Sequence, residues 1–172
     1  MHQLKPISKD AIGGALRKAE RYRLLNEPWQ AESICRDVLR ADPDNQEALV
    51  MMLLCLTDQF GRRRSVQITQ AQEVVPKLAD EYERAYYSGM ICERWGKAQL
   101  RENESGSAGL DWLKEAMRWY ERAEALQPAR NEDAVLRWNA CARMLDRHEE
   151  PGRAAGAGDA LPLDSDDDVP MR

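Results

Sequence analysis

Apolar residues follow a helical spacing over most of the chain. The first such stretch spans residues 8–25. Its apolar or small side chains recur every three or four positions, at Ile12, Ala15, Leu16, Ala19, Tyr22 and Leu25. This spacing places them on one face of an α-helix that begins after Ser8, a suitable N-cap. The pattern therefore predicts an amphipathic first helix.

The same spacing, interrupted by turn residues, predicts seven helices. They cover approximately residues 8–25, 28–41, 46–59, 66–79, 81–101, 110–126 and 132–147. Pro28 suits the first position of a helix, whereas Pro43 ends one, and Pro76 must kink or shorten the fourth helix. Asp80 is a reasonable cap for the fifth helix, and aspartates around Pro43 can cap the third. Residues 103–109, rich in Gly, Ser and Asn, form the clearest internal loop signal.

Composition agrees with an all-α fold. Phe occurs once, and the runs of Val, Ile and Thr that mark strands are missing. The third predicted helix is apolar nearly all round between Ala48 and Leu56, which indicates burial on both sides. A chain of 172 residues favours one well-buried domain. We therefore expect one helical domain over residues 1–147.

Charge divides the chain into a neutral body and an acidic tail. Of 30 acidic and 25 basic residues, seven acids and two bases lie in residues 148–172, which leaves 23 of each in residues 1–147. The tail is dominated by Gly, Ala, Pro and Asp, and we expect it to be disordered. A neutral body argues against nucleic acid as a partner, and no apolar stretch is long enough for a membrane span.

Catalytic and metal-binding patterns are absent from the sequence. The two histidines lie near the N-terminus and beside the tail, and no metalloprotease, serine-hydrolase or phosphate-loop motif occurs. The aspartates at 166–168 lack the spacing of a calcium loop. Four scattered cysteines, none in a C-x-x-C pair, suit buried positions in a reducing cytoplasm. We expect a protein that is not an enzyme and has no cofactor or metal.

The spacing of small and bulky residues resembles the tetratricopeptide repeat, a helix pair of about 34 residues. With Ile12 as position one, the positions eight, eleven, twenty, twenty-four, twenty-seven and thirty-two hold Ala19, Tyr22, Ala31, Cys35, Val38 and Pro43. The pattern recurs later, where Gly89 falls at position eight. Ala116, Tyr120, Ala123 and Pro128 then fall at the last four positions. The second unit is the weakest match, with Leu53 where the family has a small residue.

The resemblance implies roughly three antiparallel helix pairs followed by a C-terminal capping helix. An ordinary helical bundle would use the same residues for its core and remains an alternative. In the family, the first helices of the pairs line a concave groove that binds protein segments. Carried over by position, the groove residues are Leu16, Glu20, Arg23, Val50, Leu54, Asp58, Tyr86, Met90, Glu93, Arg94, Val135, Asn139 and Arg143.

The groove so inferred is apolar, with Arg94 and Arg143 as bidentate donors at one end. It suits an apolar or amphipathic partner segment that carries an acidic group. Leu16 and Glu20 occupy positions where chaperone-binding family members need Lys and Asn, so we do not expect that activity. The sequence leaves open whether the groove is accessible or filled by the long segment inserted in the third unit.

Two functions remain open from the sequence. The first is an adaptor or small chaperone that binds another protein. The second is a self-associating structural subunit, for which the apolar third helix or the stripe of Trp112 and Trp119 could serve. Core packing is otherwise the expected role of all five tryptophans. The tail could be a regulator, a plug for the groove or a solubilising extension.

Overall fold

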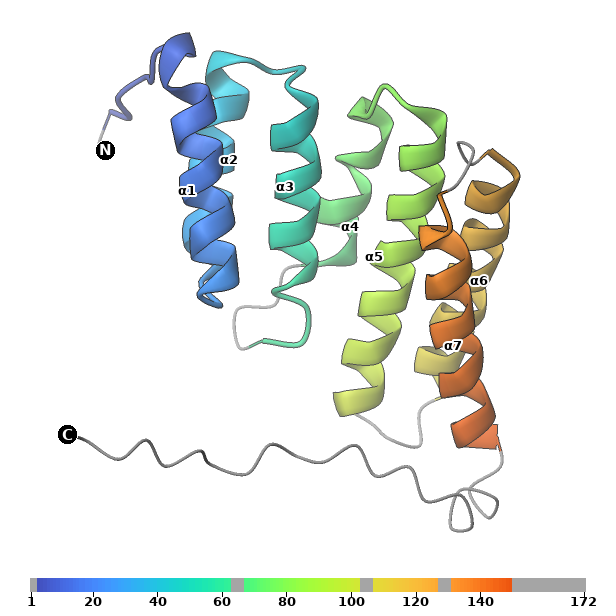
Figure 1. The fold of residues 1–172 in the computed structure, drawn as a ribbon. Coiled ribbons are helices and arrows are strands. Elements are labelled where there is room, and N and C mark those ends of the chain that lie inside the picture. The colour runs from blue at the N-terminus through green and yellow to red at the C-terminus, as the bar shows by residue number, and fades with distance from the viewer. Residues whose placement is uncertain (1–2, 63–66, 103–106, 127–130, 150–172) are drawn as a thin grey trace, which may run out of the picture.

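The computed structural model describes residues 3–62, 67–102, 107–126 and 131–149, and all regular structure within them is helical (Figure 1). Seven α-helices occur in these residues, as the sequence predicted. They are α1 (Ile12–Leu24), α2 (Pro28–Ala41), α3 (Gln46–Thr57), α4 (Ile68–Gln72), α5 (Glu81–Glu102), α6 (Ser107–Leu126) and α7 (Asp133–Glu149). Two short 3₁₀ turns, η1 (Lys9–Ala11) and η2 (Val75–Lys77), precede α1 and follow α4.

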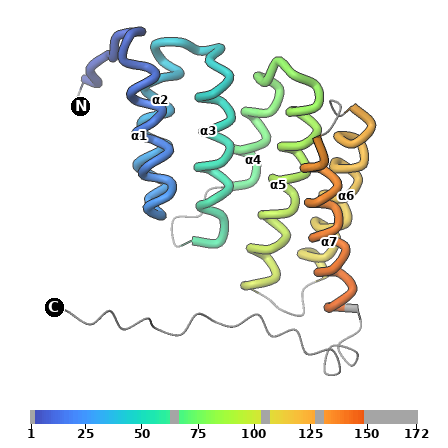
Figure 2. The backbone as a smooth tube through the Cα atoms, viewed as in Figure 1, coloured from blue at the N-terminus to red at the C-terminus, as the bar shows by residue number. Residues whose placement is uncertain are grey.

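The helices form two layers, and consecutive helices run in opposite directions (Figure 2). In the view of Figure 1, α1, α3, α5 and α7 lie in front, and α2, α4 and α6 lie behind them. The most extensive contacts join α5 with α6, followed by α1 with α2, α6 with α7 and α2 with α3. The expected all-α fold is therefore confirmed, with the odd-numbered helices on one face.

Capping residues fix several helix starts. Pro28 is the first residue of α2, as predicted. The Asp80 carboxylate accepts a hydrogen bond of 2.8 Å from the backbone N–H of Glu83, which confirms the predicted cap of α5. At α3 the prediction was wrong, because Asn45 and not an aspartate accepts the bond from Ala48, at 3.0 Å. Asn45 directly precedes the helix, and an N-cap must occupy that position.

The predicted fourth helix is shorter than its pattern suggested. It breaks into α4 and the 3₁₀ turn η2, after which Leu78 is extended. Pro76 lies inside η2, where a 3₁₀ turn tolerates its missing N–H and fixed φ better than an α-helix would. The prediction that Pro76 limits this helix is confirmed.

Two other boundaries differ from expectation. Helix α6 begins at Ser107, so residues 107–109 of the predicted loop are helical. Helix α7 continues to Glu149, so the predicted tail loses its first two residues to the helix. The predicted disorder concerns residues 150–172, which lie outside the described residues.

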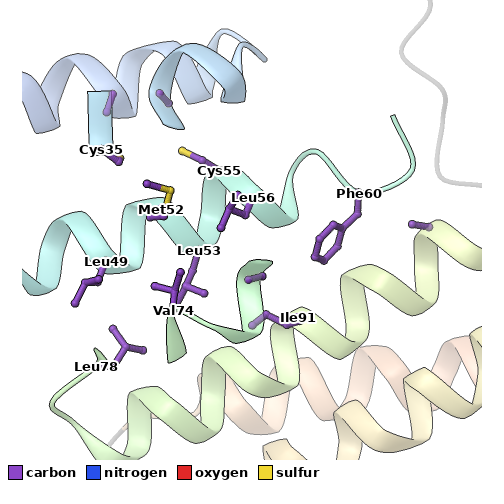
Figure 3. Close-up of a cluster of buried hydrophobic side chains, with 14 residues drawn as sticks. Cys35, Leu49, Met52, Leu53, Cys55, Leu56, Phe60, Val74, Leu78 and Ile91 are labelled. Carbon is purple, nitrogen blue, oxygen red and sulfur yellow. The ribbon is translucent and has the colours of Figure 1, made fainter. Parts of the chain in front are cut away.

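The buried side chains gather on either side of α5. The N-terminal cluster surrounds α3, with Leu49 and Leu53 each 1% exposed, and extends to Ile91 of α5 (Figure 3). The C-terminal cluster lies between α5, α6 and α7 and contains Leu113 and Tyr120. Helix α3 is therefore buried along most of its length, as predicted. All four cysteines are buried and none forms a disulfide, also as expected.

Helices α5 and α6 approach closely where both carry glycine. A Cβ atom on Gly96 would lie 2.8 Å from the carbonyl oxygen of Gly109, and one on Gly109 would lie 2.6 Å from Leu100 Cγ. Both distances are shorter than a carbon–oxygen or carbon–carbon contact allows, so only glycine permits this approach. Gly109, expected in a loop, is thus a packing residue inside a helix.

Candidate binding site on the face of the odd-numbered helices

Three of the predicted groove residues meet through one carboxylate. Arg23 Nε of α1 lies 2.6 Å from Asp58 Oδ2, at the end of α3. Arg94 of α5 binds the other oxygen of Asp58 and also donates to Thr57 Oγ1 at 2.7 Å. The three charged side chains are each 20–24% exposed. This ion pair network connects α1, α3 and α5 across the front face of the array.

The network changes what Arg94 can do. Because two guanidinium groups flank a single carboxylate, the cluster keeps a positive charge and still attracts anions. Arg94 is nevertheless held by Asp58 and Thr57, so it is less free to grip a ligand than the sequence suggested. Arg143, its expected companion, is exposed on α7 and has no contact with this network among the described residues.

The remaining predicted groove residues divide by exposure. Leu16 and Met90 are only 2% and 4% exposed, so they belong to the interior and do not line an open groove. Glu20 is exposed, and five residues are half-buried: Val50, Leu54, Tyr86, Val135 and Asn139. Tyr86 packs among other aromatic rings, with its ring centroid 5.8 Å from that of Tyr82 and 5.9 Å from that of Tyr120. Tyr86 therefore contributes mainly to the C-terminal cluster.

Glu93, also assigned to the groove, is 1% exposed and lies between α5, α6 and α7. Tyr120 Oη donates to Glu93 Oε2 at 2.6 Å, and Lys97 Nζ lies 2.5 Å from Oε1. Arg137 Nη1 lies 3.3 Å from both carboxylate oxygens. A buried carboxylate requires such compensation, and here three helices supply it.

The environment keeps Glu93 ionised. Burial alone would raise its pKa, but hydrogen bonds from Lys97 and Tyr120 and the charges of Lys97 and Arg137 lower the pKa below its ordinary value. Burial, and then the neighbouring Glu93 charge, raise the pKa of Tyr120. Neither group therefore changes protonation near neutral pH. The cluster has a structural role, because it connects α5, α6 and α7.

Two adjoining hollows lie along the C-terminal half of α5. The larger, of about 740 Å³, is lined by Lys97, Leu100, Arg101, Met144 and His148 of α5 and α7. The smaller, of about 240 Å³, is lined by Thr57, Asp58, Phe60, Gly61, Arg62, Arg94, Lys97 and Arg101. Both share Lys97 and Arg101, and we call the two hollows together the basic basin.

The basic basin combines positive charge with apolar surface. Of the described residues that line it, four are cationic and only Asp58 is acidic. Arg101 donates only to the carbonyl oxygen of Lys97 in its own helix, at 3.3 Å, among the described contacts. Leu100 and Met144 supply the apolar part. Such a surface suits a ligand with carboxylate and aliphatic groups.

Sequence reasoning missed most of the basic basin. The repeat positions carried over from the family stop at Arg94, whereas α5 continues to Glu102. Lys97 and Arg101 follow Arg94 at three and seven positions and so share its face of the helix. That spacing was visible in the sequence and could have extended the predicted site. The proximity of Lys97 and Arg101 to Met144 and His148 depends on how α7 packs against α5, and no local sequence pattern indicates it.

In the described ranges, no group of three or more His, Cys, Asp or Glu side chains is placed to hold a metal ion. No helix there is both long enough and apolar enough to cross a membrane. Comparison with known proteins gave no match to any family model, any curated protein or any solved structure. The geometry above is therefore the basis for a functional proposal.

Proposed function

We propose that the chain is a divergent tetratricopeptide array that binds a segment of another protein on the face formed by α1, α3, α5 and α7. Burial at the repeat positions supports the first part. Ala19, Ala31, Ala116 and Ala123, which fall at small-residue positions of the repeat, are all 0% exposed. At another such position, a Cβ on Gly89 would lie 2.7 Å from the ring of Tyr120. Small residues thus occur where helices approach most closely.

The observation that carries the binding proposal is the basic basin. It lies on the front face, it is hollowed, and its cations outnumber the acids that line it. A partner segment with aliphatic side chains next to Asp or Glu would place apolar area on Leu100 and Met144. Its carboxylates would meet Arg101, which is suited to bidentate pairing, and would be attracted by the positive charge that Arg23 and Arg94 retain around Asp58. An adaptor that recognises an amphipathic acidic segment is the function we infer.

Site-specific photo-crosslinking tests this function. A benzophenone amino acid at His148, which is exposed and lines the basin, should capture a partner from the lysate of the native host. The same group at Asp111, exposed on α6 in the other layer, is the matched control. Mass spectrometry of the crosslinked peptides identifies both the partner and the attached segment.

The expected result is one recurrent partner segment attached at 148 but not at 111. The charge reversal Arg101→Glu should abolish that crosslink, because Arg101 lines both hollows and forms no ion pair among the described contacts. The same proteins captured from both positions, or capture that survives Arg101→Glu, would contradict binding in the basin.

Self-association is a second candidate, favoured by a different surface from the one expected. Helix α3 is largely buried, and Trp112 and Trp119 are half-buried against the C-terminal cluster. Three exposed apolar residues instead flank the turn between α1 and α2, with Leu24 77%, Leu25 63% and Trp29 48% exposed. Trp29 thus departs from the expected core role. Sedimentation equilibrium of wild type and Leu25→Asp would detect association through this turn, with a monomeric wild type refuting it.

A further inference from the structure

The C-terminal tail contains the kind of segment that the basic basin suits. Residues 159–169 read Asp-Ala-Leu-Pro-Leu-Asp-Ser-Asp-Asp-Asp-Val and hold five aspartates and two leucines. No Lys, Arg or His occurs between residues 154 and 171. The segment therefore combines uninterrupted negative charge with two aliphatic side chains close together. This combination mirrors the cations and apolar residues of the basin.

The charge of the basin remains positive after its internal ion pairs are counted. Asp58 is shared by Arg23 and Arg94, and the buried Glu93 is shared by Lys97 and Arg137. Each cluster thus has one more positive than negative charge. Arg101 adds a further positive charge, which the neighbouring Glu102 offsets. Glu102 lies close to the smaller hollow, because its Oε1 would be 3.9 Å from a Cβ atom placed on Gly61, one of the lining residues. The surplus attracts an anionic segment.

The size of the larger hollow fits side chains of such a segment. About 740 Å³ lies within the usual range of ligand pockets, on the order of 300–1,000 Å³. Met144 and the part of Leu100 that remains exposed, 7% of that residue, give the leucines an apolar surface to cover, and Lys97 and Arg101 border that surface. Met is well suited to this role, because its unbranched, polarizable side chain adapts to different aliphatic partners.

The tail leaves the helical body at the edge of this hollow. His148 lines the hollow, and α7 ends at the next residue, Glu149. The twelve residues 150–161 can span up to roughly 40 Å, so Leu161 can reach the larger hollow, which His148 itself lines. A tether this short also gives an effective concentration on the order of millimolar, which lets a weak contact be occupied most of the time.

We infer that residues 159–169 bind in the basic basin of their own chain, with the leucines against Leu100 and Met144 and the aspartates toward Arg101 and Arg94. The basin is then a binding site for an acidic, leucine-bearing segment, and the tail is its resident occupant. A partner segment of the same chemistry must displace the tail. That competition rests on the proposed function, whereas the docking of the tail does not.

Paramagnetic relaxation in the full-length protein tests the docking directly. Ser165→Cys carries a nitroxide label, and the four native cysteines, 0–4% exposed, do not compete for the reagent. The readout is the methyl signals of ¹³C-methionine. Met144, which lines the basin, should lose its signal, whereas Met52, buried in the N-terminal cluster, should keep a larger share of its own. Reduction of the nitroxide should restore Met144 fully.

Two matched charge reversals control for chance proximity of the tethered label. Arg101→Glu should restore most of the Met144 signal, because the label then spends far less time in the basin. Arg118→Glu is the same change on an exposed arginine of α6 and should leave the broadening as in wild type. A variant that combines Asp164→Asn, Asp166→Asn, Asp167→Asn and Asp168→Asn should have the same effect as Arg101→Glu.

Three outcomes would overturn the inference. Met144 could remain as sharp as Met52, or its broadening could persist unchanged in Arg101→Glu. Alternatively, a mixture of nitroxide-labelled chains and ¹³C-labelled, nitroxide-free chains could broaden Met144 as strongly as the doubly labelled chain does, which would assign the contact to a second copy. The crosslinking experiment, which tests partner binding, can succeed or fail whichever of these outcomes is found, because it detects a peptide from another protein.

Discussion

The two halves of the array bury different chemistry in the same architecture. Around α3 the interior is aliphatic and sulfur-containing, with Leu49, Leu53 and Cys55 at 0–1% exposure. Between α5, α6 and α7 the interior encloses Glu93, the one buried charged residue of the described ranges, together with Tyr120. Helix α5 separates these two interiors and contributes to both.

The difference shows two ways of holding antiparallel helices together. Apolar burial has no preferred direction, so the N-terminal half depends on the amount and fit of its buried surface. Hydrogen bonds and ion pairs are directional, so Glu93 fixes how α7 meets α5 through Arg137. We expect the halves to respond differently to truncation, neutralisation and pH, and the following changes separate them in order of decreasing effect.

Truncation of the N-terminal core should have the largest effect. Leu53→Ala removes a side chain that is 1% exposed and should lower the free energy of unfolding by about 3 kcal/mol. The loss should be the same at pH 4 and pH 7, because no charged group is involved. Urea unfolding at both pH values measures it. Leu136→Ala, at a 62% exposed position of α7, is the control and should change stability by less than about 0.5 kcal/mol.

Neutralisation of Glu93 should come second and depend on pH. Glu93→Gln leaves Lys97 and Arg137 without their carboxylate and should cost about 2 kcal/mol at pH 7, since both cations are about a third exposed. The lowered pKa means that the carboxylate stabilises the fold above its unfolded pKa, and this contribution is lost as pH falls through the folded pKa.

The difference between wild type and Glu93→Gln should therefore be constant above about pH 5 and shrink as the solution becomes more acidic than the ordinary Glu pKa. Urea unfolding between pH 3 and 7 measures this difference. Glu124→Gln, at an exposed position of α6, should give a small and nearly pH-independent change. An equal loss for Glu93→Gln at pH 3 and pH 7 would show that the charge of Glu93 contributes nothing.

The close approach of α5 and α6 gives an effect of intermediate size. Gly96→Ala would place a Cβ 2.8 Å from the Gly109 carbonyl oxygen, so the helices must separate. The strain should exceed the gain in helix propensity and leave a net loss of about 1–2 kcal/mol. Gly14→Ala meets only the flexible end of Arg17, at 3.9 Å, and should stabilise the protein slightly. Thermal unfolding compares the two, and stabilisation by both changes would refute the close approach.

Local rules explain which parts of the fold the sequence predicted. Periodicity, Pro28 and the Asp80 cap involve residues within a turn of one another, and all three were confirmed. The prediction of a loop over residues 103–109 was partly wrong, because it treated Gly109 only as a helix breaker. Its partner Gly96 lies on another helix, and contact between them outweighs the low helix propensity of glycine.

The candidate site could be predicted from the sequence only in part. The repeat positions selected Arg23, Asp58 and Arg94, which the structure brings into one network. The same positions also selected Leu16 and Met90, which are buried, because a position on the front face does not say how deeply a side chain extends. Burial depends on neighbouring helices that the pattern does not describe.

The smallest loss of stability should come from weakening the network of Arg23, Asp58 and Arg94, which connects the two halves. Arg23→Gln removes one of the two cations on Asp58, and Arg94 still balances that carboxylate. Since all three side chains are partly solvated, the loss should be about 0.5 kcal/mol in low salt. It should fall further in 1 M NaCl, where the screening length is roughly 3 Å. Urea unfolding at both salt concentrations, with Arg21→Gln on the exposed side of α1 as control, measures it. A loss above that of Glu93→Gln would mean that this surface network, and not the buried one, dominates the electrostatic stability of the array.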